Sequence, residues 1–258
     1  MTQELLFVGA GPGDPDLITV AGLKAIQAAE LIVVAGSLVN PAIYADRRPS
    51  CQVVDSAPLT LAAIGDILIQ GYRAGLAVVR LHTGDPSLYG AIQEQMALLK
   101  EAAVPYRVIP GVTSALAAAA GLNLEWTLPE ITQTLILTRT AGRTPMPPGE
   151  DLASLAAHRA SLALYLSAAQ GREVGQILSQ AYGPQAPVAI CYRISWPDEK
   201  IIWATAETLA ETLVAERIDR HALTLVGPAV ANLKSGQSAP KSRLYAADFQ
   251  HLYRPQSP

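Results

Sequence analysis

Three glycine-bearing segments, each following a short apolar run, hold the residues whose types and spacing could do chemistry. They are Gly9–Asp14 (GAGPGD), His82–Pro86 (HTGDP) and Pro110–Ser114 (PGVTS). Glycine allows a ligand close to the backbone, and open α/β sheets bind ligands outside the carboxyl ends of their strands. Asp85 can accept from a cationic amine, and Thr113 and Ser114 could hold a carboxylate at a helix N-terminus. Alone, each segment is equally an ordinary turn or helix cap, but together they predict one shared binding crevice.

The first segment also invites comparison with a dinucleotide-binding turn. It departs from the GxGxxG pattern, because Asp14 stands where the third glycine belongs and would repel a pyrophosphate. The run Leu31–Gly36 ends in small residues, where that fingerprint requires an acidic residue that binds the ribose. A dinucleotide-dependent oxidoreductase therefore stays a second hypothesis, and a tight strand-to-helix turn is the purely structural alternative.

Alternating strands and helices must position these segments in the first half of the chain. The short apolar run 5–9 predicts a buried parallel strand, and further strands are expected at 31–35, 51–55, 77–81 and 106–109. Helical spacing predicts helices over 16–29, with Asp16 as the candidate N-cap, and over 60–74, 88–103 and 113–120. This alternation favours an α/β fold with a mainly parallel sheet.

The second half repeats the mixture of strands and helices. Strand-like runs occupy 134–137, 162–166, 188–192, 201–203 and 223–226, and helices are expected near 150–158, 171–182 and 206–217. We therefore expect two α/β domains, 1–121 with a mainly parallel sheet and 122–258 with a mixed sheet. The long loop 139–149 is typical of a functional or mobile segment. The polar stretches 234–243 and 250–258 are expected to fray.

Composition narrows the classes of partner and compartment. Half of the 258 residues are hydrophobic, 16% are charged and the net charge is −3, so a nucleic-acid partner is disfavoured. An acidic small molecule remains possible, because a few local arginines can bind carboxylates. Cys51 and Cys191 show no metal-type spacing and read as buried thiols, and no metal site is predicted. The chain shows neither a signal-peptide pattern nor a membrane-span pattern, so we expect a soluble cytoplasmic protein.

The motifs resemble a known family. Gly9–Thr19, His82–Gly90 and Pro110–Ser114 together resemble the tetrapyrrole (corrin and porphyrin) methylases, over nearly the whole chain. Finer segments resemble the branch that methylates carbon 11 of precorrin-4 or cobalt-precorrin-4: Ala35–Asn40, Leu128–Gln133, Thr138–Pro145, Gly149–Leu152 and Tyr192–Glu199. A methylase acting on uroporphyrinogen III or on another precorrin carbon is the alternative within the family.

The resemblance implies a fold, a cofactor and a partner. The fold would be two α/β domains of the tetrapyrrole methylase type, with the active site in the cleft between them, usually as a homodimer. S-adenosylmethionine would be the methyl donor and S-adenosylhomocysteine the product. The implied cofactor contacts are Pro12, Thr83, Gly84, Asp85, Leu88, Thr113, Ser114, Leu166 and Ile194.

The substrate would be an acidic tetrapyrrole, and its carboxylates suggest a second set of residues. Arg139, Arg143 and Arg193 lie in or beside predicted loops and are candidate carboxylate clamps, although solvated arginines are equally expected. Tyr89 could stack on a flat macrocycle, as could Trp196, or each could pack in the core.

The implied reaction asks little of side-chain chemistry. An electron-rich ring carbon attacks a methyl group already activated on a sulfonium, so alignment and exclusion of water carry most of the catalysis. Asp14 and Asp55 are the candidate catalytic residues, because either could orient a pyrrole N–H or take a proton. Turn formation and capping are the competing roles for such residues near strand ends.

Overall fold

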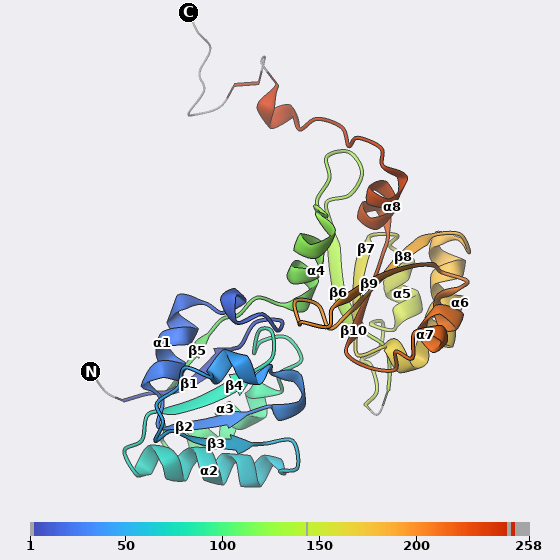
Figure 1. Cartoon of the computed structure of the whole chain (residues 1–258). Coiled ribbons are helices and arrows are strands. Elements are labelled where there is room, and N and C mark those ends of the chain that lie inside the picture. The colour runs from blue at the N-terminus through green and yellow to red at the C-terminus, as the bar shows by residue number, and fades with distance from the viewer. Residues whose placement is uncertain (1–2, 143, 247–248, 251–258) are drawn as a thin grey trace, which may run out of the picture. The chain divides into compact units, whose positions relative to one another are not determined.

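The chain forms two compact units, which Figure 1 draws in sequence colours. The computed structural model describes residues 3–142, 144–246, 249 and 250. Unit 1 comprises Met1–Gly121 together with Arg193–Lys200, and unit 2 comprises Leu122–Tyr192 and Ile201–Pro258. The segment Arg193–Lys200 thus groups with the N-terminal unit, whereas the sequence analysis expected it in the C-terminal domain.

Unit 1 is built on a five-stranded parallel sheet, as the apolar runs predicted. Its strands are β1 (Leu5–Gly9), β2 (Leu31–Val34), β3 (Gln52–Asp55), β4 (Val78–His82) and β5 (Tyr106–Ile109). Their order is β3-β2-β4-β1-β5, and all four pairings are parallel. A dinucleotide-binding sheet of the Rossmann type places β1 directly beside β2, whereas here β4 lies between them. The topology therefore argues against the dinucleotide hypothesis.

Helices cover both faces of this sheet. They are α1 (Val20–Ala28), α2 (Leu61–Arg73) and α3 (Ile92–Glu101), and α4 (Ser114–Leu122) follows β5 in the chain. Ile26 of α1 is buried in one core cluster with Val8 and Leu81. Leu68 of α2 and Leu99 of α3 are buried with Phe7 in another. Because neighbouring side chains of a strand point to opposite faces, Val8 and Phe7 place these clusters on the two sides of the sheet.

The start of α1 corrects one expectation. Asp16 is not the N-cap of this helix: Thr19 is, and its hydroxyl accepts from the backbone N–H of Gly22 at 3.1 Å. Asp16 lies instead in a short 3-10 turn, Pro15–Leu17, which the carboxylate of Asp14 caps by accepting from the Asp16 N–H. Proline at the first position of that turn fixes its backbone, so the chain makes two short helical segments in place of one.

Unit 2 contains the expected mixed sheet. Its strands are β6 (Leu135–Arg139), β7 (Ser161–Tyr165), β8 (Pro187–Tyr192), β9 (Lys200–Thr205) and β10 (Ala222–Val226), in the order β6-β7-β10-β8-β9. Strands β6 and β7 are parallel, whereas β10 runs antiparallel to both β7 and β8. The α/β class with two sheets is therefore confirmed.

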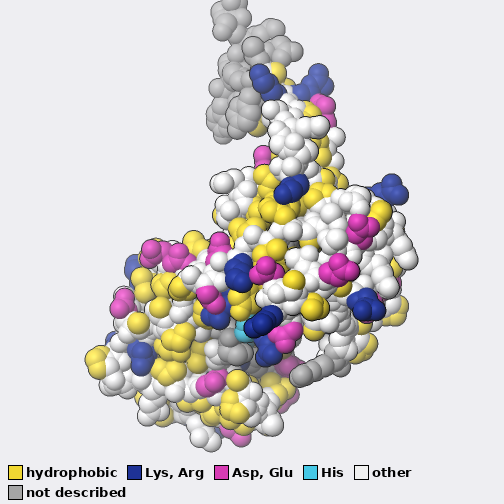
Figure 2. Space-filling view, turned by 45° about the vertical axis from the view of Figure 1, so that its right-hand side comes forward, with side chains coloured by type: hydrophobic (Ala, Val, Ile, Leu, Met, Phe, Trp, Pro, Cys, Tyr) yellow, Lys and Arg dark blue, Asp and Glu magenta, His cyan; other side chains and the backbone are white. Residues whose placement is uncertain are grey.

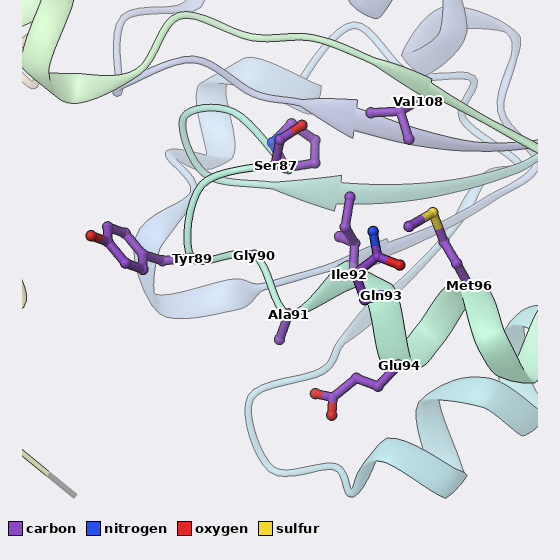
Figure 3. A pocket seen from close by; sticks show the side chains of 10 residues that line it. Ser87, Tyr89, Gly90, Ala91, Ile92, Gln93, Glu94, Met96 and Val108 are labelled. Atoms are coloured by element: carbon purple, nitrogen blue, oxygen red, sulfur yellow. The ribbon is translucent and has the colours of Figure 1, made fainter. Parts of the chain in front are cut away.

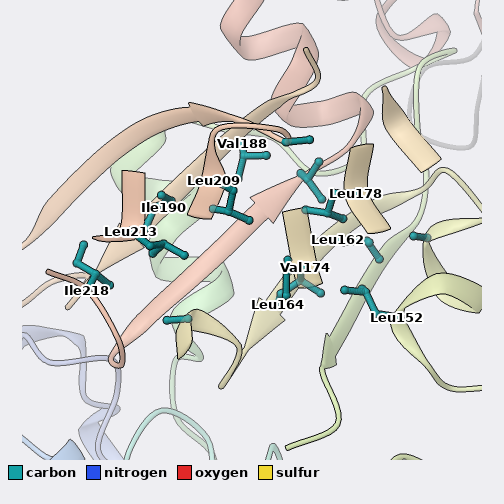
Figure 4. Close-up of a cluster of buried hydrophobic side chains, with 14 residues drawn as sticks. Leu152, Leu162, Leu164, Val174, Leu178, Val188, Ile190, Leu209, Leu213 and Ile218 are labelled. Atoms are coloured by element: carbon teal, nitrogen blue, oxygen red, sulfur yellow. The ribbon is translucent and has the colours of Figure 1, made fainter. Parts of the chain in front are cut away.

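The helices of unit 2 pack on a core of aliphatic side chains. They are α5 (Leu152–Ala156), α6 (Gly171–Tyr182), α7 (Leu209–Ala215) and α8 (Pro228–Ser235). Figure 4 shows Leu178 of α6 and Leu209 of α7 beside Leu162 and Ile190 of the sheet. Helix α8 was not predicted, although proline at its first turn after Gly227 is a recognised start signal.

The distribution of surface charges and the burial of the two cysteines agree with what the composition predicted. On the face drawn in Figure 2, Lys and Arg side chains are interspersed with Asp and Glu. Cys51 and Cys191 are both buried, and in the described part of the chain neither belongs to a disulfide. Within the described ranges, no helix is long and apolar enough to cross a membrane. The same residues contain no group of three or more His, Cys, Asp or Glu side chains placed to hold a metal ion.

Candidate functional site

The three glycine-bearing segments meet at the carboxyl edge of the unit 1 sheet. They follow β1, β4 and β5, which are neighbours in the sheet. Gly11 and Gly84 exchange backbone hydrogen bonds of 3.2 and 2.7 Å, which form an isolated antiparallel bridge. The backbone N–H of Gly111 donates to Oδ2 of Asp85 at 2.9 Å. The three segments that the sequence predicted to share a crevice thus lie side by side.

Close backbone packing explains why three of these positions are glycine. A Cβ on Gly9 would lie 2.6 Å from Cα of Gly111 and 2.7 Å from the carbonyl oxygen of Gly84. A Cβ on Gly111 would lie 2.1 Å from the same oxygen, and Gly84 itself has φ +58. No side chain fits between these strand ends, so the loops approach each other to a distance that only glycine permits.

Asp85 joins the loop after β4 to the loop after β5. Its Oδ1 accepts from the Ser87 N–H at 2.8 Å, while Oδ2 holds Gly111. The Leu88 N–H donates to the Asp85 carbonyl at 3.2 Å, which closes a tight turn. The carboxylate therefore organises the loops, and its remaining lone pairs are those available for a cationic ligand.

The loop then passes through two residues with left-handed backbone. Tyr89 has φ 57 and Ala91 has φ 48, which is uncommon for residues other than glycine. A pocket of about 590 Å³ lies along this loop, lined also by Ile92 and Met96 of α3 and by Val108 of β5. Figure 3 shows the Tyr89 ring projecting away from the aliphatic side chains of Ile92, Met96 and Val108. Tyr89 is 43% exposed, so its ring is a surface group and not part of the core.

The turn after β1 is held from two directions. Trp196, in the segment Arg193–Lys200, donates from its indole Nε1 to the Pro12 carbonyl at 2.9 Å, and the Asp14 N–H donates to Oγ of Ser195 at 3.0 Å. Asn40 donates from Nδ2 to the Gly13 carbonyl at 2.9 Å. The indole also fills the space that a Cβ on Gly13 would need, 2.2 Å from its Cδ1.

Arg193 stabilises the same segment from within. Its guanidinium lies 4.1 Å above the Trp196 ring, a cation–π contact. Its Nε lies 3.0 Å from Oδ1 of Asp198, an ion pair that is short but not aligned as a hydrogen bond. Ile194 is 5% exposed and therefore buried in the segment. The structure thus brings Arg193 and Ile194 into unit 1, beside Pro12 and Asp14 through Trp196 and Ser195.

Asp55 ends β3 at the same edge of the sheet. Its Oδ1 accepts from the backbone N–H groups of Gly36 at 3.1 Å and Ala57 at 2.9 Å. A Cβ on Gly36 would lie 2.1 Å from this oxygen, so glycine there is required by the carboxylate. Asp55 is exposed, and Asp14 is half-buried.

Thr83 follows β4, and Thr113 and Ser114 stand at the start of α4, all in unit 1, whereas Arg139 and Leu166 belong to unit 2. Arg139 ends β6, and its guanidinium donates to the carbonyls of Thr140 (3.0 Å), Thr144 (3.2 Å) and Pro145 (3.0 Å). These bonds therefore stabilise the conformation of the loop that follows β6. Leu166 follows β7 with φ 53 and is 68% exposed. Arg143 lies outside the described residues.

Arg80 and His82 of β4 are buried ionisable residues, and Arg80 was not predicted as part of the site. Burial lowers the pKa of Arg80 to about 10. Burial, and secondly the charge of Arg80, lower the pKa of His82 to about 3. Both side chains are 4% exposed. The sequence signal was an arginine inside the apolar run 77–81, which is unusual in a buried strand.

Comparison with known proteins gives a consistent result. The sequence model of the Tetrapyrrole (Corrin/Porphyrin) Methylases matches residues 4–210. A precorrin-4 C(11)-methyltransferase of Pseudomonas aeruginosa is 47% identical over 253 residues, covering 98% of this chain and 99% of that protein. The X-ray structure of a cobalt precorrin-4 methyltransferase, a cobalamin biosynthetic enzyme, superposes with TM-score 0.85 at 43% identity, covering 88% and 96%. A uroporphyrin-III C-methyl transferase of Thermus thermophilus, solved with S-adenosyl homocysteine, gives 0.73 at 26% identity, covering 88% and 98%.

Proposed function

Because the chain belongs to the tetrapyrrole (corrin/porphyrin) methylases, we propose that it methylates carbon 11 of precorrin-4 or cobalt-precorrin-4 in cobalamin biosynthesis, with S-adenosylmethionine as donor. One observation carries this assignment. The Pseudomonas aeruginosa relative with that printed activity is 47% identical and aligns over 98% of this chain. A uroporphyrinogen III methylase is the alternative within the family, and the Thermus thermophilus uroporphyrin-III C-methyl transferase is 26% identical.

The residues at the carboxyl edge of the unit 1 sheet fit such a cofactor. S-adenosylmethionine supplies a methyl group already activated on a positively charged sulfur. Its amino-acid part carries an ammonium and a carboxylate, for which the Asp85 carboxylate and the hydroxyls of Thr113 and Ser114 are chemically suited. The two glycines Gly84 and Gly111 support this assignment, because Gly84 has φ +58 and a Cβ on Gly111 would lie 2.1 Å from the Gly84 carbonyl oxygen and separate the loops. Pro12, Thr83 and Leu88 complete the proposed cofactor contacts in these loops, and Leu166 and Ile194 are proposed from the resemblance.

The proposed chemistry depends on alignment. A ring carbon of the tetrapyrrole forms a bond to the methyl carbon with its own electron pair, while the carbon–sulfur pair stays on sulfur. The cationic macrocycle then loses one proton. Asp14 and Asp55 are proposed to orient a pyrrole N–H or to receive that proton, since both carboxylates are held by backbone N–H groups at the same sheet edge.

Substrate carboxylates are proposed to contact Arg193, Arg139 and Arg143, and the macrocycle to stack on Tyr89. Arg193 supports this role best, because its partner Asp198 is 54% exposed at the side chain and a substrate carboxylate can replace an exposed partner at small cost. Arg139 already uses its fork on three loop carbonyls. Its proposed contribution is therefore the shape of the loop more than a free clamp.

Calorimetry of the whole chain with S-adenosylhomocysteine and with NAD tests the class of cofactor. We expect saturable binding of the former only. Binding of NAD alone would restore the oxidoreductase hypothesis. Transfer of a labelled methyl group to precorrin-4 and cobalt-precorrin-4, but not to uroporphyrinogen III, tests the branch of the family; the opposite preference would move the chain to the alternative. The homodimer implied by the resemblance is proposed as well, and light scattering gives its mass directly.

A further inference from the structure

Arg80 connects four elements beneath the candidate site. It lies in β4, and its Nε donates to Oε1 of Gln95 in α3 at 2.9 Å. Its Nη1 donates to the Val33 carbonyl of β2 at 3.1 Å and to Oγ of Ser56, which follows β3, at 3.0 Å. The three acceptors project from three different elements. Only a fork of several donors on one side chain reaches all of them, and lysine has no such geometry.

One arm of this network leads to Asp55. The Ser56 hydroxyl accepts from Arg80 and donates to the Val34 carbonyl at 2.9 Å, and the Ser56 N–H donates to the same carbonyl at 2.9 Å. Ser56 directly follows Asp55, whose carboxylate holds Gly36 and Ala57. The position of the Asp55 carboxylate therefore depends on the anchoring of Ser56.

The other arm leads to the cofactor loop. Gln95 accepts from Arg80 with its Oε1 and donates from Nε2 to the Ala91 carbonyl at 3.2 Å. Ala91 ends the loop that begins at Thr83 and precedes α3, and its left-handed backbone requires support from its surroundings. Gln95 is 4% exposed, so this bond is shielded from water.

The buried charge is a poor device for stability alone. All three acceptors of Arg80 are uncharged, and the side chain is 4% exposed. A buried cation without an ionised partner costs desolvation energy, and an apolar residue of similar volume commonly gives a protein that is no less stable. Geometry is what the arginine supplies and an apolar residue does not.

We propose that Arg80 is a positioning residue for methyl transfer, which sets the Asp55 turn through Ser56 and the cofactor loop 83–91 through Gln95. The inference rests on the proposed function, and it assigns a separate effect to each arm of the network. The Gln95 arm governs cofactor affinity, while the Ser56 arm governs the turnover step at which Asp55 acts. Neither arm touches substrate or cofactor directly.

Three variants separate the arms. Gln95→Met keeps the volume and removes the bonds to Arg80 and Ala91, and Ser56→Ala removes the hydroxyl alone. Arg80→Lys keeps the charge and loses the fork. Ser161→Ala is the matched control, because it deletes a buried hydroxyl of unit 2 that accepts from the Ala229 N–H at 3.2 Å. Calorimetry gives the Kd of S-adenosylhomocysteine, and the transfer assay gives kcat and KM.

We expect Gln95→Met to raise the Kd of S-adenosylhomocysteine about tenfold with kcat nearly unchanged, because the Ala91 carbonyl of the cofactor loop loses its buried donor. Ser56→Ala should lower kcat by about the same factor with Kd unchanged, and Arg80→Lys should do both. Ser161→Ala should lower thermal stability and change neither constant. The inference is overturned if the two arm variants change Kd and kcat in the same proportion, or leave both at wild-type values.

The calorimetric measurement separates failure of this inference from failure of the proposed function, since it needs no tetrapyrrole. A wild-type chain that binds S-adenosylhomocysteine while Gln95→Met binds it equally well would sink the inference alone. A wild-type chain that binds no S-adenosylhomocysteine would overturn the proposed function, and the inference with it. If Arg80→Lys does not fold, Gln95→Met and Ser56→Ala still decide the question.

Discussion

His82 is a buried histidine whose Nε2 has no hydrogen-bond partner among the described residues. Its pKa falls to about 3 in the folded chain, below the ordinary value near 6.5. The unfolded chain therefore binds the extra proton in this window, so the stabilising contribution is complete above about pH 6.5 and is lost as pH falls toward 3.

We expect unfolding free energy to decrease by up to about 1.4 kcal/mol per pH unit between pH 6 and 4 because of this residue. His82→Gln, which does not titrate, should flatten that part of the profile in urea unfolding. The control is His158→Gln, because His158 is exposed. A profile as steep in His82→Gln as in the wild type would show that other groups cause the acid sensitivity.

Gly111 carries the tightest backbone approach in the candidate site. In Gly111→Ala the new Cβ would lie 2.1 Å from the Gly84 carbonyl oxygen, so the two loops must separate. We expect a loss of about 1–3 kcal/mol of stability, typical of overpacking, together with loss of S-adenosylhomocysteine binding. Gly142→Ala is the control, since the nearest atom to its Cβ lies 4.0 Å away. Equal melting temperatures and affinities in Gly111→Ala and Gly142→Ala would contradict the requirement for glycine at the first of these positions.

At the scale of elements, the segment Arg193–Lys200 clamps the turn after β1. Trp196→Phe keeps a ring against Gly13 but loses the donor to the Pro12 carbonyl. We expect weaker S-adenosylhomocysteine binding by about three- to tenfold, because one hydrogen bond to the turn is removed. Trp203→Phe, which alters the indole beneath Lys234 in unit 2, should leave affinity unchanged. The clamp would be refuted by a Trp196→Phe chain that binds as well as that control.

The loop after β6 gives a second test at this scale. Arg139→Lys removes the fork that holds the carbonyls of Thr140, Thr144 and Pro145. We expect faster hydrogen exchange of the amides of Thr140, Gly142 and Thr144, while Arg172→Lys on the exposed side of α6 leaves them unchanged. If exchange stays slow and only the KM of the tetrapyrrole rises, Arg139 is a substrate clamp, as the sequence suggested, and not a loop brace.

The elements themselves were largely predictable, and the reasons for the exceptions are local. The runs Leu5–Gly9 and Leu31–Val34 are apolar without alternation, as buried parallel strands require. Helix α1 begins at Val20 and not near Asp16, because Pro15 favours a separate 3-10 turn. Helix α8 was missed because Pro228 was not used as a start signal, although its place after Gly227 is typical of one.

At the scale of the whole molecule, the alternation of strands and helices along the chain predicted an α/β fold, but it did not predict which strands are neighbours in the sheet. No residue pattern indicates that β4 lies between β1 and β2, because hydrophobic runs carry no information on strand order. That order decides the site, since it makes the loops after β4, β1 and β5 adjacent. The return of Arg193–Lys200 to unit 1 was equally invisible, since it depends on long-range bonds from Ser195 and Trp196 to the first turn.

Location of the transferred methyl group tests the central claim most directly. The chain is incubated with S-adenosylmethionine labelled with carbon-13 in the methyl group, in parallel with precorrin-4 and cobalt-precorrin-4, and the product is examined by NMR. The account predicts label at carbon 11 in at least one of the two products, and the preferred substrate distinguishes the metal-free route from the cobalt route. Label at any other carbon, or no transfer to either substrate, would contradict it.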